Sequence, residues 1–380
     1  MALKAKLKNW VLWKRHELQQ EKLVREHPLR YLFMEVTRRC NLACLYCGSS
    51  CTGKEPEGEM TSDEWVGVIQ QIAEDFDSKD IMVAVTGGEP LVKEGIFDIF
   101  AALNQYGFRY GMVCNGVLLD EAAASRLVEV GIGSISLSMD ALPEENDKLR
   151  GRGASAAVEQ AVRNLKDAGY KGKLEIISTI TKPAVAGLEE MRKYVGGQLK
   201  VPLWRAAPVM PIGRAAEHPE LIPDEKDIRA MLEWMKESRK DGLLPKPEFS
   251  EEGFLGYRFE GVVRPYLVSC RAGITVGGIR YDGRIGACPE LTEAFDQGDI
   301  KQQRFKEVWE TKYENMRDRS WTRKKQPCDN CKHFSACRGG SLHLYEDTDS
   351  EILRCLYLMC KSTDGMTITL GGCCTPGFYE

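Results

Sequence analysis

Strand-like and helix-like segments alternate between residues 29 and 230, and this alternation limits the possible folds more than any other feature. The strand candidates are 31–37, 81–86, 110–114, 133–139, 174–180 and 201–208. A helix is predicted over 62–75, because Thr61-Ser-Asp-Glu64 is a helix start signal. Strands that alternate with helices form a parallel sheet. Six strands are too few for a closed eight-stranded barrel, so the sequence predicts an α/β fold without barrel closure.

Three cysteines, Cys40, Cys44 and Cys47, follow the first strand candidate within the run CNLACLYC. Their spacing places three thiolates on one short loop, where they can bind three irons of a cubane cluster. Four cysteines close most electron-transfer clusters, so three leave an iron open to a substrate or cofactor. The alternative is structural zinc, which prefers four protein ligands. Only Cys51 lies nearby as a further thiol, and no histidine lies within ten residues.

Composition excludes several classes of protein. The net charge of −4 argues against a nucleic-acid-binding protein. No run approaches the length of a membrane span, and the N-terminus lacks a secretory signal, so a cytoplasmic protein is expected. Fourteen cysteines in a reducing compartment favour metal or catalytic use over disulfides. Four of them fall between 40 and 51, and nine between 270 and 374.

Residues 1–28 form a candidate amphipathic helix with a basic first half. Such a helix can lie on a membrane surface. Packing against the barrel or a second domain is the favoured interpretation, because Glu17, Glu21 and Glu26 offset the basic residues.

The run Thr86-Gly-Gly-Glu-Pro90 ends the second strand candidate. Together with the cysteine loop, it makes the chain resemble the radical S-adenosylmethionine (SAM) superfamily. The resemblance implies an open (β/α)6 partial TIM barrel and a [4Fe-4S] cluster on Cys40, Cys44 and Cys47. It also implies reductive cleavage of SAM to a 5'-deoxyadenosyl radical, with reduced flavodoxin or ferredoxin as the electron donor.

The same resemblance implies a set of SAM-binding residues at successive strand ends. Gly87, Gly88, Glu89 and Pro90 are expected at the SAM amino group, and Tyr46 beside the adenine. Ser138 and Asp140 are expected near the ribose, and Asn115 follows the third strand. Arg150 is the first choice for the SAM carboxylate, and Arg152 is the second.

The C-terminal cysteines resemble those of the SPASM domain, which many peptide-modifying radical SAM enzymes carry. The resemblance implies one auxiliary cluster on Cys328, Cys331, Cys337 and Cys355. Cys270 and Cys288 are expected to bind a second, nearer cluster. However, Ser341 stands where that cluster usually has a further cysteine. Cys360, Cys373 or Cys374 then completes the site, or the site is open or absent. Cys114 is expected to be a buried core thiol.

The resemblance implies an oxidoreductase that modifies a peptide or protein, and small-molecule chemistry is the alternative. The small-molecule candidates are decarboxylation of a haem precursor and oxidation of an alcohol. An iron–sulfur electron carrier is the non-enzymatic possibility. Pro289 follows Cys288, where sulfatase-maturing enzymes have a catalytic Asp, so that activity is disfavoured unless Glu290 replaces it.

A finer resemblance rests on two short runs, His27–Arg30 and Pro211–Ala215. A SPASM group of unsettled function, paired with small lipoproteins, shares them. The expected domain boundaries are an N-terminal helix at 1–28, a barrel at 29–230, a bridge at 231–267 and a SPASM domain at 268–380.

Overall fold

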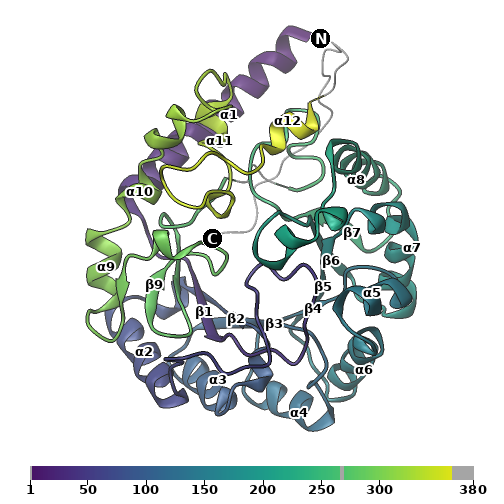
Figure 1. The fold of residues 1–380 in the computed structure, drawn as a ribbon, viewed down its shortest axis with the longest axis vertical. Coiled ribbons are helices and arrows are strands. Elements are labelled where there is room, and N and C mark those ends of the chain that lie inside the picture. The colour runs from purple at the N-terminus through teal and green to yellow at the C-terminus, as the bar shows by residue number, and fades with distance from the viewer. Residues whose placement is uncertain (1, 266–268, 362–380) are drawn as a thin grey trace.

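The computed structural model describes residues 2–265 and 269–361, with side chains of the first helix from Lys14 onward. Its strands form one sheet in the order β10-β9-β8-β1-β2-β3-β4-β5-β6-β7. Strands β8 and β1 to β7 run parallel, and the β8–β9–β10 end is antiparallel. Figure 1 shows the sheet curving inside a ring of helices. Its two outer strands do not pair, so the barrel is open, as predicted.

The element bounds are as follows. The strands are β1 (Tyr31–Thr37), β2 (Met82–Gly87), β3 (Arg109–Cys114), β4 (Ser134–Ser138), β5 (Lys173–Ile180), β6 (Leu203–Pro208), β7 (Lys246–Phe249), β8 (Val276–Ile279), β9 (Arg284–Gly286) and β10 (Gly298–Asp299). The helices are α1 (Ala2–Glu26), α2 (Ser62–Asp75), α3 (Ile96–Gln105), α4 (Glu121–Glu129), α5 (Pro143–Arg150), α6 (Ala154–Asp167), α7 (Leu188–Lys193), α8 (Glu225–Ser238), α9 (Phe305–Thr311), α10 (Glu314–Arg317), α11 (Phe334–Cys337) and α12 (Leu356–Cys360).

All six predicted strands are present as β1 to β6, with ends that differ from the prediction by two residues at most. The predicted helix 62–75 is α2, and Thr61 and Glu64 form a reciprocal capping box at its start. The strands bury apolar residues under the surrounding helices, as in Met34, Val83 and Ile135. This burial on both faces explains why the strands read as continuous apolar runs.

Four further strands extend the sheet beyond the six that the sequence predicts, and two of them, β7 and β8, pair directly with predicted strands. Strand β7 lies in the expected bridge and pairs with β6, and helix α8 crosses the expected boundary at residue 230. Strand β8 comes from the C-terminal region and pairs with β1, with Tyr31 opposite Val276. Both were missed because their sequences, KPEF and VGGI, carry proline or glycine and little strand propensity.

Helix α1 packs against the C-terminal region, in contact with α11. Ser269 donates a hydrogen bond to the Gln20 side chain at 3.2 Å, and the indole of Trp309 donates to the carbonyl of His27 at 2.8 Å. These contacts support the packing interpretation over a membrane-surface helix. Within the described residues, no helix is both long and apolar enough to span a membrane.

Candidate functional site

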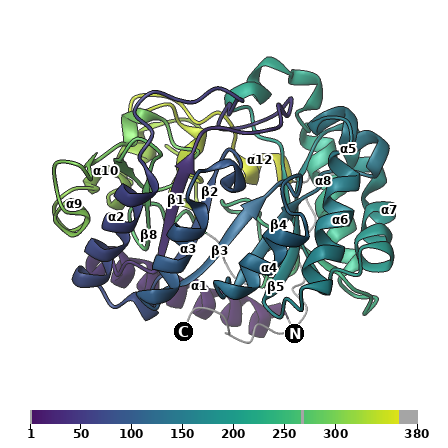
Figure 2. The same cartoon turned by 90° about the horizontal axis from the view of Figure 1, so that it is seen from below.

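The cysteine loop begins at the C-terminal end of β1, and it turns back so that its beginning and its end lie side by side. Arg39 and Thr52 form an isolated bridge, and the Cys40 amide donates to the Thr52 carbonyl at 2.7 Å. The loop lies at the C-terminal end of the parallel strands (Figure 2). That end is where α/β barrels carry their active sites.

Arg214 fastens the cysteine loop from the other side of the barrel. Its guanidinium donates to the main-chain carbonyls of Cys44 at 2.9 Å and Cys51 at 2.7 Å. Its amide donates to the carbonyl of Cys47 at 3.0 Å. A Cβ on the preceding Gly213 would lie 2.1 Å from the Gly48 carbonyl oxygen, so only glycine permits this approach. The sequence singled out Pro211–Ala215 but gave Arg214 no role.

The two glycines of the Thr86–Pro90 run are packed against the stem of the same loop. The Gly88 amide donates to the Thr37 carbonyl at 2.8 Å, and the Glu89 amide to the Arg39 carbonyl at 2.9 Å. A Cβ on Gly87 or Gly88 would lie 2.1 Å from those same two carbonyl oxygens. The sequence explained the glycines by their approach to a ligand. The structure adds that they fix this run against the cysteine loop.

A cavity of about 230 Å³ lies between the cysteine loop and the strand ends. Most of the predicted site residues line it: Cys40, Cys44, Tyr46, Cys47, Gly87, Gly88, Asn115, Ser138 and Arg150. Glu89, Pro90 and Asp140 do not line it. Cys114 also borders the cavity, and its side chain is buried as the sequence predicted.

Glu89 is fully buried behind the cavity, where it joins two strand ends. Its carboxylate accepts hydrogen bonds from the amides of Asn115 at 2.7 Å and Leu91 at 3.2 Å. Burial raises the pKa of Glu89 to about 7, against the opposing effect of these amides. The side chain of Asn115 in turn donates to Asn41 in the cysteine loop at 2.7 Å. Glu89 therefore holds the backbone at the end of β3 against the Thr86–Pro90 run, and its contact with the SAM amino group stays a prediction.

Asp140 is the buried centre of a polar network below the cavity. Its carboxylate accepts from the Tyr46 hydroxyl, from Arg150 Nη1 at 2.6 Å and from the Thr179 amide at 2.5 Å. Asp140 is 1% exposed and these bonds position Tyr46 and Arg150, while its contact with a ribose stays a prediction. Arg150 Nε has no hydrogen-bond partner among the described residues, and it is buried. Arg152, in contrast, is exposed.

The four C-terminal cysteines of the SPASM-like set gather in one place. Burial raises the pKa of Cys328 to about 12, and the nearby thiols of Cys337, Cys355 and Cys331 add to this rise. Cys328, Cys337 and Cys355 also line a second, small cavity. Four convergent thiols are the donor set that a [4Fe-4S] cluster requires.

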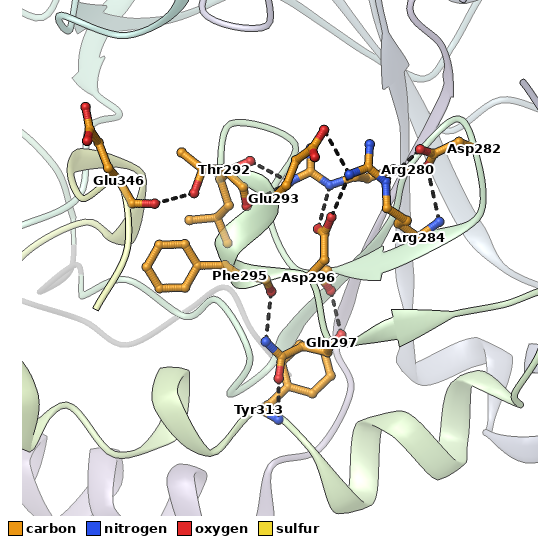
Figure 3. A network of polar contacts seen from close by, with 12 residues as sticks. Arg280, Asp282, Arg284, Thr292, Glu293, Phe295, Asp296, Gln297, Tyr313 and Glu346 are labelled. Atoms are coloured by element: carbon orange, nitrogen blue, oxygen red, sulfur yellow. Dashed lines mark hydrogen bonds and ion pairs between the residues drawn. The ribbon is translucent and has the colours of Figure 1, made fainter. Parts of the chain in front are cut away.

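Cys288 lies close to Cys270, and both belong to the expected nearer site. The segment after Cys288 is held by a polar network (Figure 3). Arg280 donates to the carbonyls of Leu291 and Thr292 and to Asp296 at 2.7 Å, while Thr292 donates to the Glu346 carbonyl. This network fixes the segment that follows β9, in which Glu290 reaches the wall of the first cavity.

Cys360, Cys373 and Cys374 are the candidate ligands to complete the nearer site, and the position of Cys360 argues against that residue. Its thiol lies on α12 beside Glu260, Arg264 and Cys355, on the side of the other cysteine set. Cys373 and Cys374 lie outside the described residues. Ser341 is buried, and its hydroxyl donates to Glu251 Oε1 at 2.8 Å.

Two side chains that the sequence did not single out, Glu251 and His343, complete the far wall of the first cavity. His343 Nε2 lies 3.3 Å from Glu251 Oε1, and Nδ1 lies 3.8 Å from Glu290 Oε2. Burial disfavours the protonated imidazole, but Glu251 outweighs it and raises the pKa of His343 to about 10. No local motif marks these residues, because they come together only in the folded chain.

Comparison with known proteins agrees with this arrangement. The family model of the radical SAM superfamily matches residues 34–183, and that of the SPASM iron–sulfur cluster-binding domain matches residues 270–332. An AdoMet-dependent heme synthase of Methanosarcina barkeri is 26% identical over 340 residues, covering 84% of this chain and 93% of the relative. The mycofactocin maturase MftC of Mycolicibacterium smegmatis is 27% identical, covering 82% and 77%.

Solved structures share the fold. Native anSMEcpe with bound AdoMet matches with a TM-score of 0.69 at 19% identity, covering 88% of this chain and 94% of that one. Streptococcus suis SuiB bound to the precursor peptide SuiA matches with a TM-score of 0.66 at 17% identity, covering 88% and 78%. From the two domain models and these relatives, the chain belongs to the radical SAM superfamily as a SPASM-domain enzyme, with [4Fe-4S] clusters and SAM as its cofactors.

Proposed function

We propose that this enzyme oxidises a side chain of a peptide or protein, with SAM bound in the first cavity. One observation carries the proposal. The three loop cysteines, Arg150 and the wall formed by Glu251, Glu290 and His343 all face one cavity. When bound to Cys40, Cys44 and Cys47, a [4Fe-4S] cluster supplies the electron that cleaves SAM into methionine and a 5'-deoxyadenosyl radical.

The chain's own residues then have distinct tasks. Gly87 and Gly88 offer backbone groups to the SAM amino group, and the unpartnered Nε of Arg150 offers a donor to its carboxylate. Arg214 and the Gly87–Gly88 backbone keep the cysteine loop in register with these groups. Cys328, Cys331, Cys337 and Cys355 hold one auxiliary cluster, and Cys270 and Cys288 contribute to a nearer one. Reduced flavodoxin or ferredoxin serves as the electron donor.

The net reaction removes one hydrogen atom, one proton and one electron from the substrate. The hydrogen atom would leave in 5'-deoxyadenosine, and the cluster that Cys328, Cys331, Cys337 and Cys355 would hold would supply the acceptor for the electron. Glu290 is placed to take the proton, because it lines the cavity and its side chain is about half exposed there. The barrel keeps water away from the radical.

The charge of the far wall favours a peptide over a polycarboxylate substrate. Glu251 and Glu290 outnumber the single cation that His343 provides, so a ligand rich in carboxylates meets repulsion there. The relatives include a mycofactocin maturase, and a fold neighbour is bound to a precursor peptide, which supports the same choice. The second candidate, decarboxylation of a haem precursor, is supported by the heme synthase relatives.

The test supplies both substrate classes to anaerobically reconstituted enzyme with SAM and a reductant. The peptides are the short proteins encoded beside its gene, and the small molecules are iron-bound porphyrin precursors. We expect 5'-deoxyadenosine to form in step with a peptide product that is two hydrogen atoms lighter. Carbon dioxide released from a porphyrin, with no change in any peptide, would overturn the peptide assignment. Glu290→Gln should lower peptide product per 5'-deoxyadenosine released, because proton removal is slowed after the radical has formed.

A further inference from the structure

Glu251, Glu252 and His343 place three possible metal ligands close together beside the far wall of the first cavity. Glu251 and His343 line this cavity, whereas Glu252 lines the second one. One donor atom from each residue lies within 4.8 Å of the other two. Glu251 and Glu252 follow the edge strand β7, whereas His343 sits in the short turn after Ser341. The proposed SAM chemistry assigns no task to this group, which we call the Glu–His cluster.

Carboxylates outnumber the cation at the Glu–His cluster and its half-exposed neighbour Glu290. Glu251 and His343 are 8% and 7% exposed, and Glu290 adds a third carboxylate 3.8 Å from His343 Nδ1. A protonated imidazole offsets only one of these three carboxylates. Uncompensated charge in a protein interior is costly, so the site favours a further cation.

Arg264, which contacts the backbone of Glu251, does not provide that cation. Arg264 is fully buried, and its guanidinium pairs with Glu260 at 2.5 Å. Its remaining donors go to the main-chain carbonyls of Glu251 and Gly253, both at 2.6 Å. The Arg264 charge is therefore already matched by Glu260.

His343 gives an independent sign of a missing ligand. Its Nε2 atom is buried and makes no hydrogen bond within the described part of the chain, although Glu251 Oε1 lies 3.3 Å away. That same oxygen already accepts a hydrogen bond from the Ser341 hydroxyl at 2.8 Å. A buried imidazole nitrogen that has an ion-pair neighbour but no hydrogen bond, beside a carboxylate held by the Ser341 hydroxyl, fits the position of a metal ligand.

We propose that Glu251, Glu252 and His343 hold one divalent transition-metal ion. The imidazole nitrogen disfavours Mg²⁺ and Ca²⁺, which select oxygen ligands, and favours Zn²⁺, Mn²⁺ or Fe²⁺. Three protein ligands leave a coordination position open, as in catalytic zinc sites. Because Glu251 and His343 line the SAM cavity, the open position faces the substrate. A carbonyl or hydroxyl oxygen of the substrate is the group that it would bind.

This inference gives a reason for the serine at position 341. At this position a cysteine would contribute to the nearer cluster in the SPASM pattern, but the Ser341 hydroxyl instead orients Glu251. The ion would replace the proton on His343 and would lie near the Cys288 thiol, because Glu252 and Glu290 are both close to that thiol. The proposal holds for either substrate class, so its failure and that of the proposed function are separable.

The test is a titration of full-length, cluster-loaded protein with Mn²⁺ after removal of loosely bound metal by a chelator. Free Mn²⁺ gives a strong room-temperature EPR signal that disappears on binding, and oxidised [4Fe-4S] clusters do not obscure it. We expect one Mn²⁺ per chain, displaced by Zn²⁺. Glu252→Gln and His343→Gln should each weaken binding by more than about tenfold, and Ser341→Ala by about tenfold.

The controls separate this site from other possible sites. His218→Gln changes a partly exposed histidine that also lies beside a carboxylate, Glu220 at 3.0 Å, and should leave binding unchanged. Cys270→Ser and Cys288→Ser should also retain it, and iron content reports whether each variant has folded. Absence of the single Mn²⁺ site in the wild-type protein overturns the proposal. So does binding that survives Glu252→Gln and His343→Gln, or that is lost only in the cysteine variants.

Discussion

Arg214 Nε donates to the main-chain carbonyl of Cys44 at 2.9 Å, although 170 residues separate the two in sequence. The contact joins the segment after the sixth strand to the loop after the first. The cysteine loop is therefore held from both sides of the barrel, and its thiols are presented to the cavity in a fixed arrangement. Such preorganisation of ligand-bearing loops is what cluster and metal sites depend on.

Replacement of Arg214 should loosen the loop without removing any thiol. Arg214→Lys keeps the charge but loses the fork that spans Cys44 and Cys51, so we expect slower SAM cleavage and partial loss of loop-bound iron. Iron content and 5'-deoxyadenosine yield measure the two effects. Arg163→Lys, on the exposed face of α6, is the matched control. If Arg214→Lys keeps its full iron content and cleaves SAM as fast as the wild-type enzyme, the Arg214 hydrogen bonds do not contribute to function.

Iron counting tests the two sets of cysteines. The Cys40→Ala, Cys44→Ala and Cys47→Ala triple variant should lose about four irons and all SAM cleavage. The iron that remains in this variant gives the number of auxiliary clusters. About eight irons correspond to two auxiliary clusters, and about four correspond to one. Cys360→Ala should retain full iron, because this thiol lies beside Glu260 and Arg264 rather than beside Cys288. Iron loss in that variant would contradict the assignment.

Arg150 and Arg152 provide a paired test of SAM binding. Arg150 lines the cavity and has an unpartnered donor, whereas Arg152 is exposed. A hydrogen bond to a charged group contributes about 1.5–3 kcal/mol. Arg150→Gln should therefore raise the dissociation constant of SAM by about tenfold to a hundredfold. Isothermal titration of both variants measures it, and equal effects at Arg150 and Arg152 would refute the assignment.

Acid should loosen the docking of α1 through His16. Burial, with the charge of Arg271 beside it, lowers the pKa of His16 from 6.5 to about 4. Between pH 4 and 6.5 the unfolded chain then binds more protons than the folded one, so stability falls as the pH falls. Amide hydrogen exchange in the second half of α1, corrected for intrinsic rates, should be faster at pH 5.5 than at pH 7.5.

His16→Gln should remove most of this pH dependence, and His218→Gln should not change it. An α1 that exchanges equally at both pH values in the wild-type protein would show that His16 is not buried against the C-terminal region in solution.

The sequence predicted the parts of the fold whose signals are local. Strands β1 to β6 are long apolar runs between helices, so their periodicity alone identifies them. Strands β7 and β8 are short and contain Pro247 or Gly277 and Gly278, and they exist because β6 and β1 provide a template. Strand pairing between segments far apart in the chain cannot be recognised from either segment alone.

The residues of the candidate site also divide into those with a local sequence signal and those without one. The cysteine loop and the Thr86–Pro90 run could be found because each is a continuous motif. Arg214 and the Glu–His cluster could not, because their partners are far apart in sequence and meet only after folding. Asp140 differs from both groups. The sequence identified it as a site residue, and the structure shows that it is buried and binds the side chains of Tyr46 and Arg150.

The pairing of β8 with β1 makes the barrel and the C-terminal region one folding unit rather than two modules on a tether. A chain cut after residue 265 would leave β1 as a bare sheet edge, with Leu32 and Met34 partly uncovered and free to pair with another molecule. The same pairing fixes the separation between the two cysteine sets. In the proposed mechanism, electron transfer between the clusters that they would bind then takes place over a constant distance and does not require domains to move together.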